Sequence, residues 1–486
     1  MLADNDPESK DLGMAQVDRT FIDIEDVYKH YVGAALYRTT TVNTLVAYTT
    51  EYIAKKKESG ALKNDDDIIR ECYYCLRKVF LEMYYKGPVH SDLEKYMTGK
   101  KLYKKVLKQQ EKDNQQKEER EDEIRINSVL FATALRMSLA AQSIQSELFV
   151  YIPRKLGAWR DVVFLDELDF VMKVKSKRRN YFLEAFNNFD AFASPYPYLE
   201  GVEGYSIGYD EPNKYYKTPG PTSTYEDNLE RKNYNVNFND AMDKIGVERI
   251  TVLTGHQKSD KIGIANLDRS YLSKDFEKYY NQPVQKGKRK KEDEVIDITT
   301  SVGYESPDKD EKIKERKELM EKDIKNEFDI DMYLDFELID NGRYGDSAAL
   351  KYKETFSLKK LISRAGKNYI FDVGKLIGDQ VKLEQTEIEK RETDIWLQNA
   401  RAIENNMTIT LPAGYSVEGL QELNMSIDNE SGAFISTAKT EGDKLIIGTR
   451  KLYKKNADKK EQWPNYVAFL EAAYKFSQAK VVLKKK

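Results

Sequence analysis

The first third of the chain is dominated by hydrophobic residues at helical spacing. Between Ile68 and Tyr85 apolar side chains recur every three or four positions, after the acidic run Asp65 to Asp67. Gly87-Pro88 follows, and both residue types disfavour helix. Residues 21–110 are therefore predicted to be mainly helical. Ile126 to Ala141 returns to the same pattern and predicts a further helix.

Shorter apolar runs, typical of strands, come next. They are Glu147 to Ile152, Leu168 to Val174 and Tyr181 to Leu183. The following segment, Ser194 to Pro221, is rich in Tyr, Pro and Gly and predicts loop. Helices followed by strands and loops indicate an α+β domain over residues 65–240, preceded by an N-terminal helical segment over residues 1–64.

Two highly charged stretches interrupt these patterns. Lys104 to Arg125 has no apolar residue between Lys108 and Glu123, so it cannot bury a face. It predicts an exposed insertion, helical or disordered, at about residues 104–125. Lys286 to Lys325 alternates charges in the same way. Residues 241–330 are therefore predicted to form a charged helical, partly disordered linker.

Beyond residue 330 the pattern changes to short strands separated by turns. Such spacing predicts an antiparallel β-sandwich over residues 331–486. The expected strands are Met332 to Ile339, Ala349 to Phe356, Met407 to Leu411, Phe434 to Thr440 and Lys444 to Leu452. A C-terminal amphipathic helix follows Trp463-Pro464, and Val481 to Leu483 is expected to close the sheet.

Composition excludes several kinds of chemistry. The 486 residues include 3 His and 2 Cys, too few for a multi-histidine metal site, a Cys/His zinc cluster or a disulfide framework. We expect no metal and no cofactor. The net charge of −3 does not favour nucleic acid, and Glu292 to Glu294 directly follows the basic patch Lys286 to Lys291. Tyrosine is abundant, with 33 residues.

No apolar stretch reaches the roughly 18 residues that a membrane-spanning helix needs. The most apolar window, Val129 to Ala141, contains Arg136. The N-terminal residues show no basic start followed by an apolar core, so no secretory signal is visible.

Several short motifs resemble a known family. They are Gly374 to Gly378, Leu411 to Tyr415, Asp428 to Gly432 and Lys480 to Lys484 in the C-terminal half, with Tyr196 to Gly201 and Thr218 to Gly220 before them. Together they resemble the transglutaminase-like envelope proteins of Gram-negative bacteria, which have no assigned function. The resemblance implies a papain-like transglutaminase domain followed by a terminal β-domain, and a periplasmic or outer-membrane-associated location.

The same resemblance implies where a cysteine-dependent site would lie. Its cysteine position falls between Ile124 and Ser128, its histidine position on Phe170 or Asp169, and its acid position on Glu184. A thiolate nucleophile needs an imidazole base and an orienting acid. Neither Cys nor His occupies these positions, so we expect a degenerate site without cysteine-dependent activity.

Other chemical residues suggest structural roles. Ser128 could be a nucleophile beside Asp169, but the nearest histidine in sequence is His90, and a helix cap explains this serine. Cys72 and Cys75 lie within one amphipathic helix and are expected to be buried neutral thiols. His30 and His256 each stand alone, His256 in an expected loop. Gly374 to Gly378 lacks the phosphate-loop pattern and predicts a strand and turn.

The leading hypothesis is therefore a non-catalytic protein that binds a polypeptide or glycan. Tyr196, Tyr198 and Tyr205 are the candidate binding residues, because aromatic side chains give contact area at low entropic cost. Packing of these rings within their own domain is the competing interpretation. Two other functions stay open: a transferase or hydrolase with a non-standard site, and a structural component of an envelope assembly. The oligomeric state is undetermined from sequence.

Overall fold

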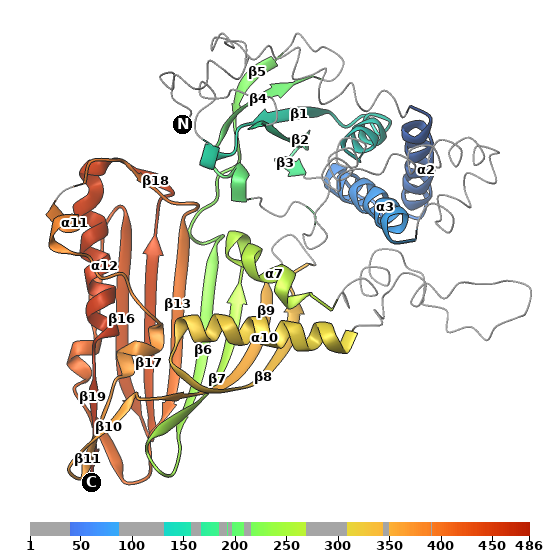
Figure 1. Ribbon diagram of the computed structural model, residues 1–486. Helices are drawn as coiled ribbons and strands as arrows, with labels where there is room; N and C mark the ends of the chain where they lie inside the picture. Colours follow the sequence, from blue (N-terminus) through green and yellow to red (C-terminus); the bar gives the residue numbers. More distant parts are fainter. Residues whose placement is uncertain are drawn as a thin grey trace, which may run out of the picture. The chain divides into compact units, whose positions relative to one another are not determined.

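The computed structural model describes residues 39–86, 131–156, 167–183, 192, 197–208, 215–268, 309–343, 349–389 and 391–486 (Figure 1). The described residues divide into two compact units. Unit 1 contains those up to Leu183 and from Tyr198 to Pro221, and unit 2 contains chiefly Thr222 to Lys486. Helices and several antiparallel sheets occur together, and the C-terminal region is rich in strands. The α+β class is therefore confirmed.

Unit 1 begins with helices that pack through apolar faces. They are α2 (Thr39–Glu58), α3 (Asp65–Lys86) and a helical segment at residues 131–140. Tyr52 on α2 donates a hydrogen bond to Glu71 on α3 at 2.9 Å, and the ring of Tyr73 meets that of Phe131 edge-on. α3 has the bounds that the hydrophobic spacing and the acidic N-terminal run predict.

A five-stranded antiparallel sheet completes the described part of unit 1, with the order β3-β2-β1-β4-β5. Its strands are β1 (Ser146–Tyr151), β2 (Asp169–Lys175), β3 (Asn180–Leu183), β4 (Glu203–Ile207) and β5 (Tyr215–Pro219). Short 3₁₀ turns lie at η3 (Arg154–Leu156) and η6 (Pro197–Leu199). The first three strands agree with the predicted ones to within one or two residues.

The last two strands correct the prediction of loop over Ser194 to Pro221. Gly204 lies within β4, and a Cβ there would come 2.5 Å from the Val150 carbonyl oxygen and 2.7 Å from the Phe149 ring. This glycine therefore allows close packing inside a sheet instead of a turn. Pro219 ends β5, where a missing N–H is tolerated.

Unit 2 is built on an eight-stranded sheet with the order β15-β16-β17-β13-β6-β7-β9-β8. Its strands are β6 (Leu229–Phe238), β7 (Lys244–Leu253), β8 (Ile330–Asn341), β9 (Leu350–Lys359), β13 (Arg401–Thr410), β15 (Met425–Asp428), β16 (Gly432–Glu441) and β17 (Lys444–Tyr453). Neighbours are antiparallel except β13 and β6, which run parallel with Met407 opposite Tyr234.

One face of this sheet is covered by helices and a smaller sheet (Figure 1). The covering helices are α10 (Lys309–Glu327) and α12 (Trp463–Ser477). The smaller sheet has the order β10-β11-β19-β14 and contains β10 (Ile362–Ala365), β11 (Asn368–Phe371), β14 (Tyr415–Glu418) and β19 (Val481–Lys485). A single apolar core joins these layers, and Phe356, Phe434 and Phe469 are fully buried in it.

Short elements complete unit 2. They are η7 (Gly255–Lys258), α7 (Ser259–Ala265), η8 (Val373–Ile377), α11 (Gln385–Glu389), β12 (Ile395–Trp396), η9 (Leu420–Leu423), β18 (Ala457–Asp458) and η10 (Lys460–Gln462). The strand and turn expected at Gly374 to Gly378 are instead the 3₁₀ turn η8. A Cβ at Gly374 would come 2.0 Å from the Phe476 carbonyl oxygen, so this turn lies directly against the end of α12.

The boundary between units differs from the expected one. Residue 240 falls in the β6–β7 hairpin, whereas the units separate near Pro221. β6 pairs with β13 and β7 pairs with β9, so residues 229–253 belong to the sheet of unit 2 and not to a linker. Within the expected linker, α10 is a charged helix, as predicted. The expected insertion at residues 104–125 and the basic patch Lys286 to Lys291 lie outside the described residues.

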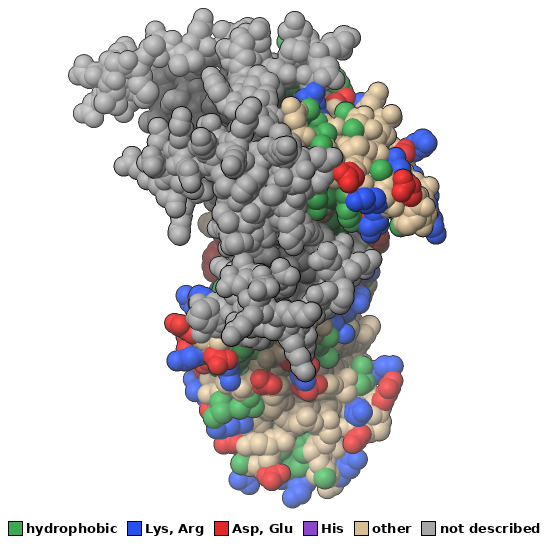
Figure 2. Space-filling model, turned by 90° about the vertical axis from the view of Figure 1, so that its right-hand side faces the viewer, with side chains coloured by type: hydrophobic (Ala, Val, Ile, Leu, Met, Phe, Trp, Pro, Cys, Tyr) green, Lys and Arg blue, Asp and Glu red, His purple; other side chains and the backbone are tan. Residues whose placement is uncertain are grey.

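Charged side chains of both signs are interspersed on the face of unit 2 seen in the lower part of Figure 2. Exposed ion pairs of unit 2 include Lys459 with Asp394 at 2.9 Å and Lys484 with Glu418 at 2.7 Å. Among the described helices, none combines the length and apolarity needed to cross a membrane.

Candidate functional site

Part of the predicted site lies outside the described residues. This holds for the nucleophile positions Ile124 and Ser128, for the acid position Glu184 and for Tyr196. His30 and His90 also lie outside them. The described part of the predicted site consists of Asp169, Phe170, Tyr198 and Tyr205.

Asp169 and Phe170 begin β2 and point to opposite faces of the sheet, as consecutive strand residues do. The Asp169 carboxylate is engaged locally. The hydroxyl of the buried Tyr151 donates to its Oδ2 at 3.2 Å, and the Phe170 backbone N–H donates to its Oδ1 at 2.8 Å. Phe170 lies opposite Val150 in the β1–β2 ladder. The histidine position therefore carries an apolar ring, and its neighbour is an acceptor that fixes the start of β2.

A polar network crosses the face of the sheet to which Asp169 points. We call it the Glu147 cluster, formed by Glu147, Lys173, Lys175, Ser206 and Tyr216. Lys173 Nζ lies 3.2 Å from Glu147 Oε2 and donates to Ser206 Oγ at 3.1 Å, while Lys175 Nζ donates to Glu147 Oε1 at 2.7 Å. The Tyr216 hydroxyl donates to the same carboxylate at 2.6–2.7 Å. The cluster thus links β1, β2, β4 and β5.

The electrostatics of this cluster favour its charged form. Burial alone would raise the pKa of Glu147, but hydrogen bonds from Lys175, Tyr216 and Lys173 outweigh it and lower that pKa. The hydrogen bond to Glu147 raises the pKa of Lys175 in turn. Sequence reasoning missed this cluster, although strand alternation places Glu147, Lys173 and Lys175 on one face.

Lys173 and Ser206 are the residue types of a serine–lysine catalytic pair, so the question is whether this lysine can act as a base. A lysine base must be neutral to take a proton from serine. Here the Lys173 ammonium forms an ion pair with Glu147, and the Ser206 side chain has no exposed surface. The arrangement suits a lysine that donates to the serine and holds neighbouring strands together.

The two cysteines lie in the helical layer of unit 1 and are buried, as predicted. Burial, with the nearby Cys75 and Glu71, raises the pKa of the Cys72 thiol. The Cys75 thiol lies 3.9 Å from Thr49 Oγ1 on α2. Because a thiolate is the reactive form, this environment disfavours nucleophilic chemistry at Cys72.

The histidine of the described residues, His256, belongs to unit 2. It is buried in the 3₁₀ turn η7 where a loop was expected, and its backbone N–H donates to Asn228 Oδ1 at 2.9 Å. Within the described ranges, no three His, Cys, Asp or Glu side chains are grouped so that they could hold a metal ion.

The described candidate tyrosines do not form one surface. Tyr198 is 39% exposed on η6, beside the turn where the Gly201 N–H donates to the Pro221 carbonyl at 2.8 Å. Tyr205 lies further along β4, with its ring 6.0 Å edge-on from that of Tyr215 on β5. Sequence reasoning missed Tyr215 and Tyr216, which are 50% and 45% exposed on β5.

β5 is the edge of the sheet and pairs with β4 alone among the described strands. The Gly220 N–H donates to the Val202 carbonyl at 2.7 Å, which marks a hydrogen-bonded position of the antiparallel ladder. Such positions alternate, so Thr218 and Tyr216 are the next ones along β5. Tyr215 and Lys217 therefore direct their backbone N–H and C=O groups away from β4, and Pro219 does the same with its carbonyl alone.

Unit 2 contains a second ionic network, between its large sheet and α10. We call it the Arg249 cluster, formed by Arg249, Lys232, Glu327, Glu354 and Tyr333. The Arg249 guanidinium donates to Glu327 at 2.6 Å and to Glu354 at 2.8 Å, and Lys232 donates to Glu327 at 2.7 Å. Tyr333 donates to Glu354 at 3.2 Å. The cluster fixes the last residue of α10 to β6, β7 and β9.

Its charges hold each other ionised. Burial would raise the pKa of Glu327, but Arg249 and Lys232 outweigh burial and lower that pKa to about 2. Burial opposes the charge of Arg249, yet Glu327 and Glu354 raise its pKa. Burial and the neighbouring Glu354 raise the pKa of Tyr333. Glu327 and Arg249 are therefore charged at neutral pH, whereas the Tyr333 hydroxyl is neutral, and the cluster acts as a structural clamp.

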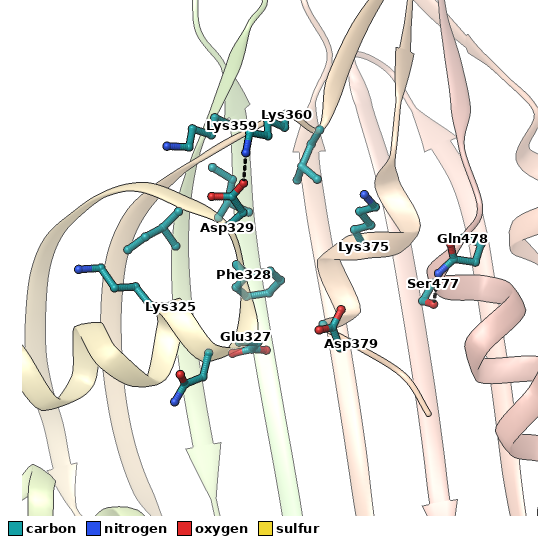
Figure 3. A pocket seen from close by; sticks show the side chains of 15 residues that line it. Lys325, Glu327, Phe328, Asp329, Lys359, Lys360, Lys375, Asp379, Ser477 and Gln478 are labelled. Atoms are coloured by element: carbon teal, nitrogen blue, oxygen red, sulfur yellow. Dashed lines mark hydrogen bonds and ion pairs between the residues drawn. The ribbon is translucent and has the colours of Figure 1, made fainter. Parts of the chain in front are cut away.

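A pocket of about 680 Å³ lies beside this clamp in unit 2 (Figure 3). Its walls come from the end of α10, the β8–β9 region, η8 and the residues after α12. Lysine and acidic side chains line it together with the Phe328 ring. The volume suits a small ligand. Sequence reasoning missed this pocket, because its walls come from separate segments spread over residues 325–478.

The chain shows limited similarity to known proteins. Residues 368–483 match the model of a family described as a domain of unknown function with a solved structure (DUF3858). The match begins at the first residue of β11 and ends within β19. It includes most of the C-terminal motifs on which the resemblance rests.

No curated protein matches the chain. A crystal structure of a protein from Parabacteroides distasonis, named a "putative protease", aligns with 93% of this chain at 9% identity and a TM-score of 0.36. The chain spans 58% of the length of that structure. The comparisons therefore relate the C-terminal part of this chain to a domain whose function is unknown.

Proposed function

We propose that this chain is a non-catalytic protein that binds an extended polypeptide at the β5 edge of unit 1. The observation that carries the proposal is the outward direction of the backbone polar groups of Tyr215 and Lys217. An edge strand whose outward backbone groups have no partner among the described residues can accept a further strand from another chain.

The side chains of β5 suit such an added strand. Tyr215 and Tyr216 are half exposed and lie on opposite faces of the sheet, so each could contact alternate side chains of a bound segment. Tyr216 is anchored by its hydroxyl to Glu147, which limits the entropy lost on binding. Lys217 pairs with Glu203 of β4 at 2.6 Å. A polypeptide is favoured over a glycan because backbone pairing is specific to it.

The absence of cysteine-dependent catalysis is part of the proposal. Three observations support it: the apolar Phe170 at the histidine position, the buried thiols of α3, and the Lys173 ammonium held by Glu147. The positions expected for a catalytic site come from the resemblance to transglutaminase-like envelope proteins. The envelope location is likewise a prediction from that resemblance.

A proline substitution tests the binding mode. A library of random unstructured dodecapeptides displayed on phage serves as the probe, and enriched peptides are synthesised for affinity measurements. Lys217→Pro removes the outward N–H without removing a β4–β5 hydrogen bond, so we expect it to weaken binding about tenfold or more. Lys217→Ala keeps the N–H and loses the same side chain, so we expect it to bind as the unchanged protein does.

Equal affinities of Lys217→Pro and Lys217→Ala, or no enriched peptide, would contradict binding by strand addition. Binding on a glycan array that Tyr215→Ala abolishes and Lys217→Pro leaves intact would favour the glycan alternative. Hydrogen exchange gives an independent readout, because bound peptide is expected to protect the amides of Tyr215 and Lys217 while leaving those of β3 unchanged.

An activity assay tests the proposed absence of cysteine-dependent catalysis. A glutamine-containing peptide and a primary amine are supplied as acyl donor and acceptor, and ammonia release and amine incorporation are followed. We expect neither above the buffer control. Ammonia release that Cys72→Ser or Ser206→Ala abolishes would instead establish the enzyme alternative.

A further inference from the structure

The charges in the pocket of unit 2 are unevenly compensated. Several of its ionic groups are already paired with neighbours. Lys325 lies 2.7 Å from Glu321, Lys360 lies 2.7 Å from Asp329, and Glu327 belongs to the Arg249 cluster. These paired groups leave little net charge for a ligand. Lys359 also lines the pocket and makes no ion pair among the described residues, but Figure 3 shows its amine well away from the Lys375 amine and the Asp379 carboxylate.

Lys375 and Asp379 differ from them. The Lys375 side chain is 53% exposed, and its ammonium lies 3.7 Å from one carboxylate oxygen of Asp372, whose other oxygen is 3.1 Å from Lys480. Asp379 is exposed, and within the described ranges it makes no ion pair. Figure 3 shows the Lys375 amine above the Asp379 carboxylate along the same side of the pocket. Lys375 and Asp379 do not pair with each other, so two opposite charges face the pocket at separate points.

The helix ends add to the negative side. α10 has 19 residues and ends at Glu327, and α12 has 15 residues and ends at Ser477. The C-terminal turn of each lines the pocket. A helix C-terminus carries a partial negative charge, which favours a bound cation. Asp379 and these two ends therefore form a pole for an ammonium group, and Lys375 forms one for a carboxylate.

We propose that this pocket binds a small zwitterion, a short peptide with free termini, with its ammonium at Asp379 and its carboxylate at Lys375. Phe328, Leu358 and Leu361 also line the pocket and suit the apolar body of such a ligand. The site lies in unit 2 and is separate from the β5 edge of unit 1.

Three forms of one tripeptide test the proposal with the full chain. Trialanine carries both charges, N-acetyl-trialanine lacks the ammonium, and trialanine amide lacks the carboxylate. Isothermal titration is expected to show saturable binding of trialanine. Each modified form is expected to bind about tenfold more weakly or worse, since each loses a charge-assisted contact.

Two variants assign the poles. Asp379→Asn should bind trialanine and its N-acetyl form with equal affinity while still discriminating against the amide. Lys375→Gln should bind trialanine and trialanine amide with equal affinity while still discriminating against the N-acetyl form. Asp443→Asn and Lys367→Gln change exposed residues that do not line the pocket, so they serve as matched controls and should bind as the unchanged protein does.

The proposal is overturned if trialanine shows no saturable binding, or if its three forms bind equally well. It is also overturned if Asp379→Asn and Lys375→Gln retain the discrimination of the unchanged protein. Thermal unfolding of each variant verifies that it is folded. Asp379→Asn and Lys375→Gln leave β5 unchanged, so loss of discrimination in them distinguishes this pocket from binding at the β5 edge.

Discussion

The Glu147 cluster of unit 1 and the Arg249 cluster of unit 2 use the same kinds of side chain for different purposes. The Arg249 cluster joins a helix to a sheet, and the Arg249 and Glu354 side chains are 4% and 0% exposed. The Glu147 cluster lies within one sheet and reaches the edge strand through Tyr216, which is 45% exposed. The Arg249 cluster therefore decides whether two layers stay together, whereas the Glu147 cluster orders the exposed Tyr216 side chain on the edge strand β5.

The largest expected effect is that of Arg249→Ala. It leaves the buried carboxylates of Glu327 and Glu354 without their main partner, so we expect unit 2 to lose about 3–5 kcal/mol of its free energy of unfolding. Urea titration followed by hydrogen exchange in peptides from β7 and β9 measures it. Lys244→Ala on the same strand removes the exposed pair with Asp331 and should have no measurable effect. A similar loss of stability in both variants would show that the buried Arg249 cluster contributes no more than an exposed ion pair.

Acid should act on the Arg249 cluster in a defined direction. The pKa of Glu327 is lowered to about 2, below the roughly 4.3 of an unfolded glutamate. Its contribution is therefore complete above pH 5 and is lost as the pH falls towards 2, a change of about 3 kcal/mol. Stability of unit 2 measured against pH tests this. Glu327→Gln should start less stable and lose this part of the pH dependence; an unchanged slope would contradict the assignment.

A smaller effect is expected in unit 1 for Glu147→Gln. The amide keeps the shape but leaves the buried Lys173 ammonium without its counter-charge, at a cost of about 1–3 kcal/mol. Hydrogen exchange in peptides from β1 and β2 reports it. The matched variant is Glu203→Gln, which removes an exposed pair on β4 and should leave the exchange unchanged. If both variants behave alike, the cluster has no special role in the sheet.

The smallest effect should come from Tyr216→Phe. It removes the hydroxyl that donates to Glu147 and accepts from Lys173 and Lys175 at 3.4 Å, and it keeps the ring, so we expect a loss of about 0.5–1.5 kcal/mol in unit 1. Faster amide exchange at β5 than at β1 would show that the edge is the part that loosens. Tyr215→Phe, whose hydroxyl is outside the cluster, is the control. If the two substitutions change amide exchange equally, the Glu147 cluster does not determine how well β5 is ordered.

Local patterns predicted several elements well. α3 and α12 begin where an acidic run and a Trp-Pro pair indicate, and β16 and β17 match their predicted strands within two residues. These elements are defined by spacing within a short window, which the sequence displays directly.

The remaining elements depend on partners that are distant in the chain. β6 carries Arg and Asn on its outer face, but Glu230 and Lys232 share the inner face with the buried Tyr234 and Val236, so its apolar alternation is weak. Its parallel partner β13 lies about 170 residues away. Gly204 was interpreted as a breaker because the Phe149 ring against it cannot be foreseen from spacing. The Glu147 cluster and the unit 2 pocket each gather residues from several segments, so their chemistry follows from tertiary structure.

The parallel pairing of β6 with β13 also constrains how unit 2 can be made. On the ribosome the β6–β7 hairpin emerges long before residues 401–410. β6 therefore lacks its partner β13 until that strand has been synthesised. A fragment that starts at residue 331 would contain β9 and β13 but not the two strands that lie between them. Its sheet would be split in the middle, so recombinant fragments of this half should begin before residue 222.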